Sequence, residues 1–87
     1  MIIDVHTHIF PDEVCNDRKR FLDEKGFSLL YSSEKSKTVN AAALAGMMQA
    51  EAVDYAVALG FQWQRRDRAR MHNDTIRQAI ENGRGRI

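Results

Sequence analysis

The stretch Ile2-Ile3-Asp4-Val5-His6-Thr7-His8 carries polar side chains at alternate positions of an otherwise apolar segment. Successive side chains of a β-strand point to opposite faces, so the pattern predicts a strand with Asp4, His6 and His8 on one face. Pro11 cannot extend a ladder of hydrogen bonds, so Phe10-Pro11-Asp12 predicts the exit of this strand into a loop. His6 and His8 therefore lie near the C-terminal end of the strand, where α/β proteins hold metals and ligands.

Two explanations account for an imidazole pair of this kind. The histidines could simply form hydrogen bonds inside a core, or they could be ligands of a divalent metal ion. A polar group that is buried without a partner costs about 1 to 3 kcal/mol, and a metal would satisfy several such groups at once. We therefore favour the metal.

Composition limits the class of protein. The chain has 87 residues, of which 44% are hydrophobic, and a net charge of +1, so we expect one small soluble domain or part of a larger one. No apolar stretch approaches the roughly 20 residues of a membrane span, and the polar residues of the opening strand argue against a signal peptide. Cys15 is the only cysteine, so an internal disulfide is excluded and a cytoplasmic location is expected.

The segment between about residues 9 and 39 is a long, mostly polar excursion. Apolar spacing predicts a short helix ending before Gly26, and Ser32 to Lys37 is expected to be a turn-rich connector. An active-site loop and an ordinary surface insertion would look alike here.

A regular alternation follows the excursion. Asn40 is a good N-cap for a helix over Ala41 to Ala52, and Tyr55 to Leu59 predicts a strand buried on both faces. A second helix is expected from about Asp67 to Asn82, with an inner stripe of Ala69, His72, Ile76, Ala79 and Ile80. Gly83 is expected to be the left-handed residue that ends it, and Arg86-Ile87 to begin a third strand. Such alternation predicts an α/β fold with parallel strands, as in doubly wound sheets and (β/α)8 barrels.

Several segments together resemble the amidohydrolase superfamily, in particular the amidohydrolase-related group that includes aminocarboxymuconate-semialdehyde decarboxylase-like enzymes. The resemblance spans nearly the whole chain and is carried by Ile2 to Pro11, Leu29-Leu30-Tyr31, the methionine-containing helix, Val53 to Phe61, Trp63, and His72-Asn73-Asp74 to Gly85-Arg86.

The resemblance implies a partial (β/α)8 TIM barrel: the first two βα units, with an enlarged first loop at about residues 9–39. It implies an enzyme that depends on a metal and is either a hydrolase or a decarboxylase, the latter being a lyase. In such an enzyme His6 and His8 would bind a divalent metal, most often zinc. Asp4 would orient the strand or support the site from behind the ligands. Phe61 and Trp63 are available to contact a small carboxylate or amide substrate. The family usually has glycine where this sequence has Ala52.

The same resemblance implies further ligands and a catalytic base from later strands, which two βα units do not include. Two histidines are fewer than the three protein ligands of an ordinary catalytic zinc site. His72 lies within a predicted helix and is assigned a structural role. We therefore expect the chain to be either an N-terminal fragment, inactive alone, or a unit that forms homo-oligomers through open strand edges.

A third reading concerns the basic C-terminal quarter. It contains Arg65, Arg66, Arg68, Arg70, Arg77, Arg84 and Arg86. Such a surface could bind nucleic acid, but the charge of the whole chain is nearly balanced and no nucleic-acid motif accompanies the arginines. A solvated helix is the preferred explanation, so neither nucleic acid nor a membrane is expected as a partner.

Overall fold

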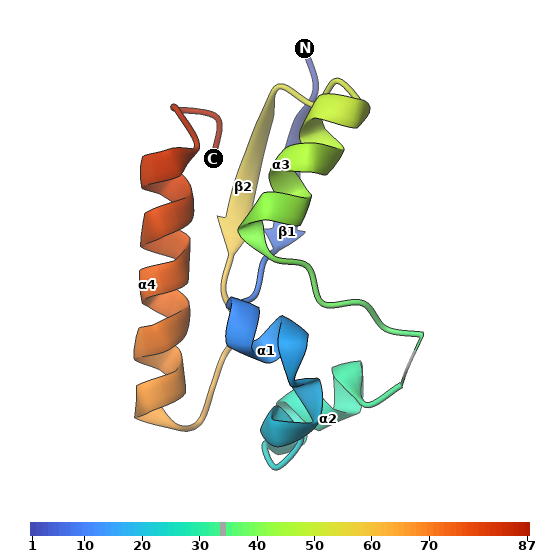
Figure 1. The fold of residues 1–87 in the computed structure, drawn as a ribbon, viewed down its shortest axis with the longest axis vertical. Coiled ribbons are helices and arrows are strands. Elements are labelled where there is room, and N and C mark those ends of the chain that lie inside the picture. The colour runs from blue at the N-terminus through green and yellow to red at the C-terminus, as the bar shows by residue number, and fades with distance from the viewer. Residues whose placement is uncertain (34) are drawn as a thin grey trace.

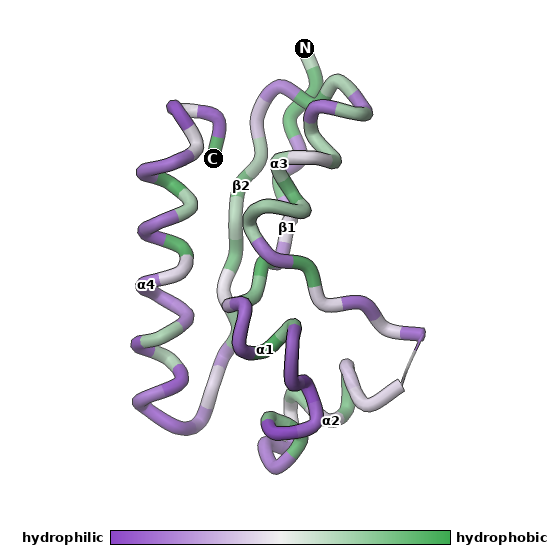
Figure 2. Tube along the Cα trace, viewed as in Figure 1, coloured by the Kyte–Doolittle hydropathy of each residue, from purple (hydrophilic) through white to green (hydrophobic). Residues whose placement is uncertain are grey.

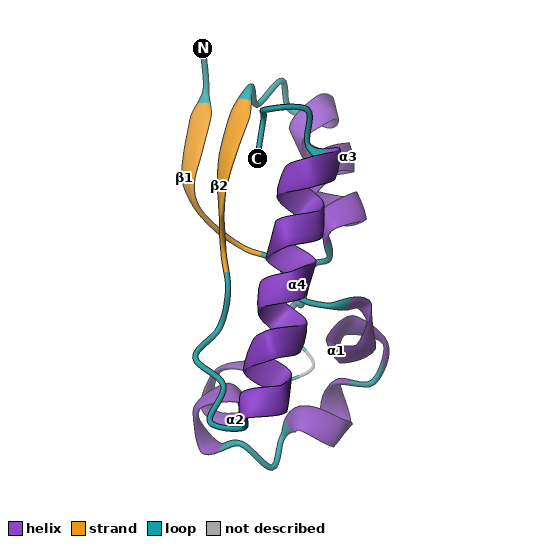
Figure 3. Cartoon of the chain, turned by 90° about the vertical axis from the view of Figure 1, so that its left-hand side faces the viewer, coloured by secondary structure: helices purple, strands orange, loops and turns teal. Residues whose placement is uncertain are grey.

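Two parallel strands, β1 (Ile3–His8) and β2 (Tyr55–Leu59), form the sheet of the computed structural model, which describes residues 1–33 and 35–87. Helices α3 (Ala41–Ala50) and α4 (Arg66–Asn82) lie on the same side of this sheet (Figures 1 and 3). The predicted order of strand, helix, strand and helix is confirmed, and the chain is a small α/β domain.

A β-bulge interrupts β1. Asp4 is the partner of Ala56 and Thr7 is the partner of Ala58, so two residues of β1 stand opposite Val57 alone. Partners on neighbouring strands present their side chains to the same face, which places Asp4 with Ala56 and His8 with Leu59 on opposite faces. The prediction that Asp4 shares a face with both histidines is therefore wrong, because it assumed an unbroken alternation.

In residues 1–33 and 35–87, helices cover one face of the sheet. On that face Ile9, Ala56, Leu44 and Met48 of α3, and Ala79 of α4 form a buried core. Along α4 the outer edge is mainly hydrophilic (Figure 2).

The other face of the sheet is apolar, and no described element covers it. Its side chains Ile3, Val5, Tyr55 and Val57 are between 41% and 69% exposed. The prediction that β2 is buried on both faces is therefore wrong for the described residues, although its sequence suits burial on both.

The excursion after β1 folds beneath the C-terminal ends of the strands (Figure 1). It forms α1 (Asp12–Asn16), a 3-10 helix η1 (Arg18–Phe21) and α2 (Lys25–Tyr31). The predicted end before Gly26 is wrong, because Gly26 lies inside α2, whose Phe27 anchors it in an aromatic cluster. The predicted connector Ser32–Lys37 contains Glu34, which lies outside the described residues.

The end of α3 requires a left-handed residue. Asn40 caps the start, since its side chain accepts the N–H of Ala43 at 2.8 Å. At the other end Ala52 has φ of 55°, and the N–H of Val53 donates to the carbonyl of Met48 at 2.9 Å. This is the Schellman arrangement, which glycine favours because a Cβ is strained at positive φ.

We expect Ala52→Gly to stabilise the domain by up to about 1 kcal/mol, since glycine relieves the strain although it adds freedom to the unfolded chain. Urea unfolding measures the change. Ala50→Gly, within the same helix, is the matched control and should destabilise by a similar amount. A destabilised Ala52→Gly would contradict the left-handed assignment.

The turn after α4 differs from its prediction. Gly83 has φ of −80°, and the left-handed residues are Arg84 and Gly85, with φ of 52° and 81°. A Cβ on Gly83 would stand 2.9 Å from the carbonyl oxygen of Ala79 and from the Cβ of Ile87, so glycine is needed here for space. The turn returns the chain to β2, where Arg86 accepts the N–H of Ala56 at 2.8 Å. This single bond lies where a third strand was expected, but no strand is formed there.

Candidate metal centre

The imidazoles of His6 and His8 meet at the C-terminal end of β1. Their Nε2 atoms are 3.1 Å apart, and the rings make an edge-on contact with centroids 4.9 Å apart. His6 is exposed and His8 is half-buried. His6 lies in the bulge and His8 follows two residues later, and the contact between their Nε2 atoms shows that both rings reach the same place.

The ring of His8 has a defined orientation. Its Nδ1 lies 3.2 Å from the carbonyl oxygen of Gly60, the residue that follows β2. A carbonyl can only accept, so Nδ1 carries the proton and the Nε2 of neutral His8 presents a lone pair. Histidines that bind a metal through one ring nitrogen usually donate a hydrogen bond of this kind from the other ring nitrogen. The sequence pattern predicted no role for Gly60. Its position directly after a predicted strand was the one indication that its carbonyl could lie near the histidines.

The pair fits a metal ion. The two Nε2 atoms are 3.1 Å apart. If each lay about 2.0 to 2.1 Å from one ion, the angle between them at the ion would be about 100°, close to the tetrahedral angle. In residues 1–33 and 35–87, however, no group of three or more His, Cys, Asp or Glu side chains is gathered for a metal. The described residues therefore bring together two imidazoles, fewer than the three side chains of an ordinary catalytic zinc site.

Asp4 contacts the strand and not the imidazoles. Its Oδ1 accepts the backbone N–H of His6 at 3.2 Å, across the bulge. The carboxylate thus holds the irregular backbone that carries the first histidine. Such a contact supports a site from behind the ligands.

The two aromatic residues assigned to substrate lie in a cluster below the sheet. Trp63 is 8% exposed and buried with Phe10, Phe21 and Phe27, while Phe61 is half-buried at the edge of this cluster. The indole N–H of Trp63 donates to the Nδ1 of His72 at 2.8 Å. Phe61 is therefore the more accessible of the two.

His72 is buried apart from the imidazole pair. Its Nε2 lies 2.6 Å from the carbonyl oxygen of Ile9, while its Nδ1 accepts from Trp63. An indole only donates, so His72 is neutral with its proton on Nε2. Burial lowers the pKa of His72 below its ordinary value of 6.5, and repulsion from His8 acts in the same direction, although the bond to Ile9 opposes both.

We expect stability to fall as the pH drops below 6.5. The unfolded chain binds a proton at His72 near that pH, whereas the folded chain resists protonation until a lower pH, so acid favours unfolding in this window. Urea unfolding at pH 7 and pH 5 measures the loss. His72→Gln cannot titrate and should show a smaller difference between the two conditions; an equal difference would contradict this assignment.

Arg68 is buried, contrary to its expected place on a solvated face. It is 6% exposed, and its Nη1 lies 2.7 Å from Asp23 and 2.8 Å from Glu24. Its guanidinium also lies over the rings of Phe21 and Trp63. This ion pair ties α4 to the excursion and lowers the pKa of Asp23. Ile80, assigned to the inner stripe, is instead 51% exposed.

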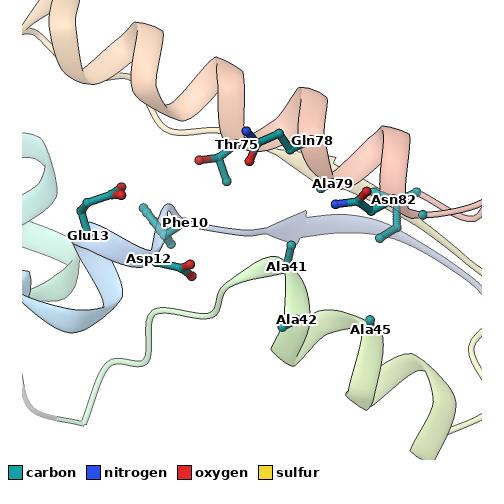
Figure 4. A pocket seen from close by; sticks show the side chains of 12 residues that line it. Phe10, Asp12, Glu13, Ala41, Ala42, Ala45, Thr75, Gln78, Ala79 and Asn82 are labelled. Carbon is teal, nitrogen blue, oxygen red and sulfur yellow. The ribbon is translucent and has the colours of Figure 1, made fainter.

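A groove of about 400 Å³ separates α3 from α4 (Figure 4). Ala41, Ala42 and Ala45 line one wall, and Thr75 and Gln78 stand on the other. Neither His6 nor His8 lines it. The groove is therefore separate from the candidate metal centre.

Comparisons of the chain with protein-family models, curated proteins and solved structures found no match. Function is therefore inferred from the imidazole pair, the fold around it and the sequence resemblance. Among the described residues no helix combines the length and apolar character that crossing a bilayer requires.

Proposed function

We propose that this chain forms the metal-binding opening of a metal-dependent hydrolase or decarboxylase of the amidohydrolase superfamily, with His6 and His8 as ligands of a divalent ion, zinc in the first instance. The observation that carries the proposal is the convergence of two Nε2 atoms at 3.1 Å, one of them oriented by Gly60. In the metal-free chain His6 donates this hydrogen bond to His8, and release of that proton on metal binding would leave two lone pairs that suit one ion.

The sheet supports a partial (β/α)8 barrel. Both strands are parallel and followed by helices on one face, which is the arrangement of barrel units. The uncovered face carries Ile3, Val5, Tyr55 and Val57, which suit the packed interior of a barrel. The histidines lie at the C-terminal end of β1, where barrel enzymes place their chemistry.

Each residue has a role in this proposal. His6 and His8 hold the ion, Gly60 fixes the proton of His8 on Nδ1, and Asp4 secures the bulge. A bound divalent ion supplies a water of lowered pKa or polarises a substrate oxygen. A small carboxylate or amide would enter beside Phe61, and the cytoplasm is the proposed location.

Two histidines alone do not make the usual three-ligand catalytic centre. The resemblance implies that the remaining ligands and the catalytic base lie outside residues 1–87. We therefore expect the isolated chain to bind zinc weakly and to show no turnover of its own.

Zinc binding tests the proposal. We expect weak binding by the parent and loss of binding in His6→Ala and in His8→Ala, because each variant leaves a single imidazole. Competition with a chromophoric chelator measures the affinity. Neither side chain is part of the buried core, so circular dichroism should show that both variants fold. Asp74→Ala, an exposed carboxylate on α4, is the matched control and should bind like the parent. Equal binding by all four proteins would remove the site.

A second candidate function is a non-catalytic homo-oligomer. The apolar uncovered face of the sheet favours it, because exposed patches of this kind often mark contacts between proteins. Light scattering that finds only monomer at high concentration would end this alternative.

The nucleic-acid alternative has less support. Arg65, Arg68 and Arg77 are each paired with carboxylates, which reduces the charge available to phosphates. Retention on heparin that vanishes at moderate salt would favour it nonetheless.

A further inference from the structure

His72 connects the two chain segments that leave the strands. Its Nε2 donates to the carbonyl oxygen of Ile9, the residue after β1, at 2.6 Å. Its Nδ1 accepts the indole N–H of Trp63, three residues after Gly60, at 2.8 Å, and the ring lies near Gly60, where an added Cβ would stand 3.6 Å from Cδ2. One buried side chain from α4 thus forms hydrogen bonds to both segments that leave the strands.

The backbone itself joins these ends weakly. The N–H of Ile9 donates to the carbonyl of Leu59 at 3.4 Å, which is long for such a bond. The bond from His72 to Ile9 is much shorter, and Trp63 fixes the tautomer that donates it. His72 therefore contributes strongly to the relative position of Ile9 and Gly60.

That position controls His8. His8 precedes Ile9 in the chain, and its Nδ1 donates to the carbonyl of Gly60 at 3.2 Å. A shift between the two strand ends would lengthen this bond and allow the proton of His8 to occupy Nε2. An Nε2 that carries a proton cannot bind a metal.

We propose that His72 is a positioning residue for the metal centre: by bonding to Ile9 and to Trp63 it fixes Ile9 relative to Gly60, and so keeps the Nε2 of His8 free for a metal ion. The role rests on the proposed function, since it acts on one of the two proposed ligands. His72 itself does not contact the ion.

Two substitutions of His72 separate this role from simple core packing. In His72→Gln the amide nitrogen reaches the place of Nε2 and can still donate to Ile9. In His72→Asn the amide oxygen reaches the place of Nδ1 and can accept from Trp63, but nothing donates to Ile9. We expect His72→Gln to bind zinc like the parent and His72→Asn to bind about tenfold more weakly, as substitutions behind metal ligands do.

The tautomer of His8 gives a second readout that needs no metal. Nitrogen–proton correlation spectra of the metal-free chain should find the proton of His8 on Nδ1 in the parent and in His72→Gln, and a mixture of tautomers in His72→Asn. Ile76→Val on α4 is the matched control, because it loosens the packing of the helix against the core but leaves the hydrogen bonds of His72 to Ile9 and Trp63 in place. Its His8 tautomer and zinc affinity should match the parent.

The outcomes distinguish the two proposals. An unchanged His8 tautomer in His72→Asn overturns the positioning role, and so does a changed tautomer with unchanged zinc affinity. If His72→Asn does not fold, the parent and His72→Gln decide the role: both keep the donor to Ile9, so a proton of His8 found on Nε2 in either metal-free protein overturns it. A parent chain that binds no zinc overturns the proposed function, while the tautomer comparison still decides on His72.

Discussion

Arg68→Ala is expected to destabilise the domain by about 3 to 5 kcal/mol, because it leaves the carboxylate of Glu24 buried without its cation. Glu24 is 5% exposed and lies 2.8 Å from Nη1 of Arg68. The substitution also removes the donor to the carbonyl of Arg20 and the cation that lies over Phe21. A loss of this size is a large share of the stability of a small domain.

Thermal and urea unfolding measure the effect. Arg77→Ala is the matched control, since Arg77 pairs with Asp74 and Glu81 at the surface of the same helix and should cost less than about 1 kcal/mol. Arg68→Met combined with Glu24→Gln removes both buried charges and should recover much of the loss. Equal losses of stability in Arg68→Ala and Arg77→Ala would show that burial does not make the Arg68 ion pair costlier to break.

Phe10→Ala is expected to cost about 3 to 5 kcal/mol through the cavity that it leaves. Phe10 is 1% exposed, and its ring centroid lies between 5.1 and 6.5 Å from those of five other rings. These rings belong to Phe27, Tyr31, Phe61, Trp63 and His72. The residue thus joins the excursion to the end of β2 and to α4.

Urea unfolding measures the loss, and a red shift of Trp63 emission should accompany it because water enters the cluster. Leu30→Ala is the matched control, since Leu30 is 61% exposed and its truncation should change stability by less than about 0.5 kcal/mol. A Phe10→Ala protein as stable as the parent would mean that the aromatic cluster does not hold the excursion in place.

The strands and the two long helices could be predicted from local sequence. Tyr55–Leu59 is found at the predicted residues, and the cap at Asn40 makes its predicted bond. These elements depend on periodicity and capping, which neighbouring residues determine. The histidine pair was predictable for the same reason, because only two residues separate its members.

The bulge and the partners of the histidines could not be predicted in this way. A bulge depends on the register of β2 against β1, which is a relation between residues about fifty positions apart. Gly60 and His72 reach β1 across similar separations. Single-sequence patterns carry no information about such pairs.

Arg68 and Phe10 show a further limit. An arginine on a polar helix and a phenylalanine before a proline both suggest exposed or loop positions. The excursion changes their surroundings, because Asp23 and Glu24 neutralise the first and a ring of aromatic side chains surrounds the second. Tertiary contacts decide burial at both positions.

The bulge in β1 also affects how copies of this chain can meet. A regular edge strand presents evenly spaced N–H and carbonyl groups, and other chains can add to it as further strands. In β1 the extra residue opposite Val57 breaks that even spacing, and bulged edges accept such additions poorly. The irregularity that sets the histidine pair apart from Asp4 therefore also makes the edge of β1 a poorer template for a further strand.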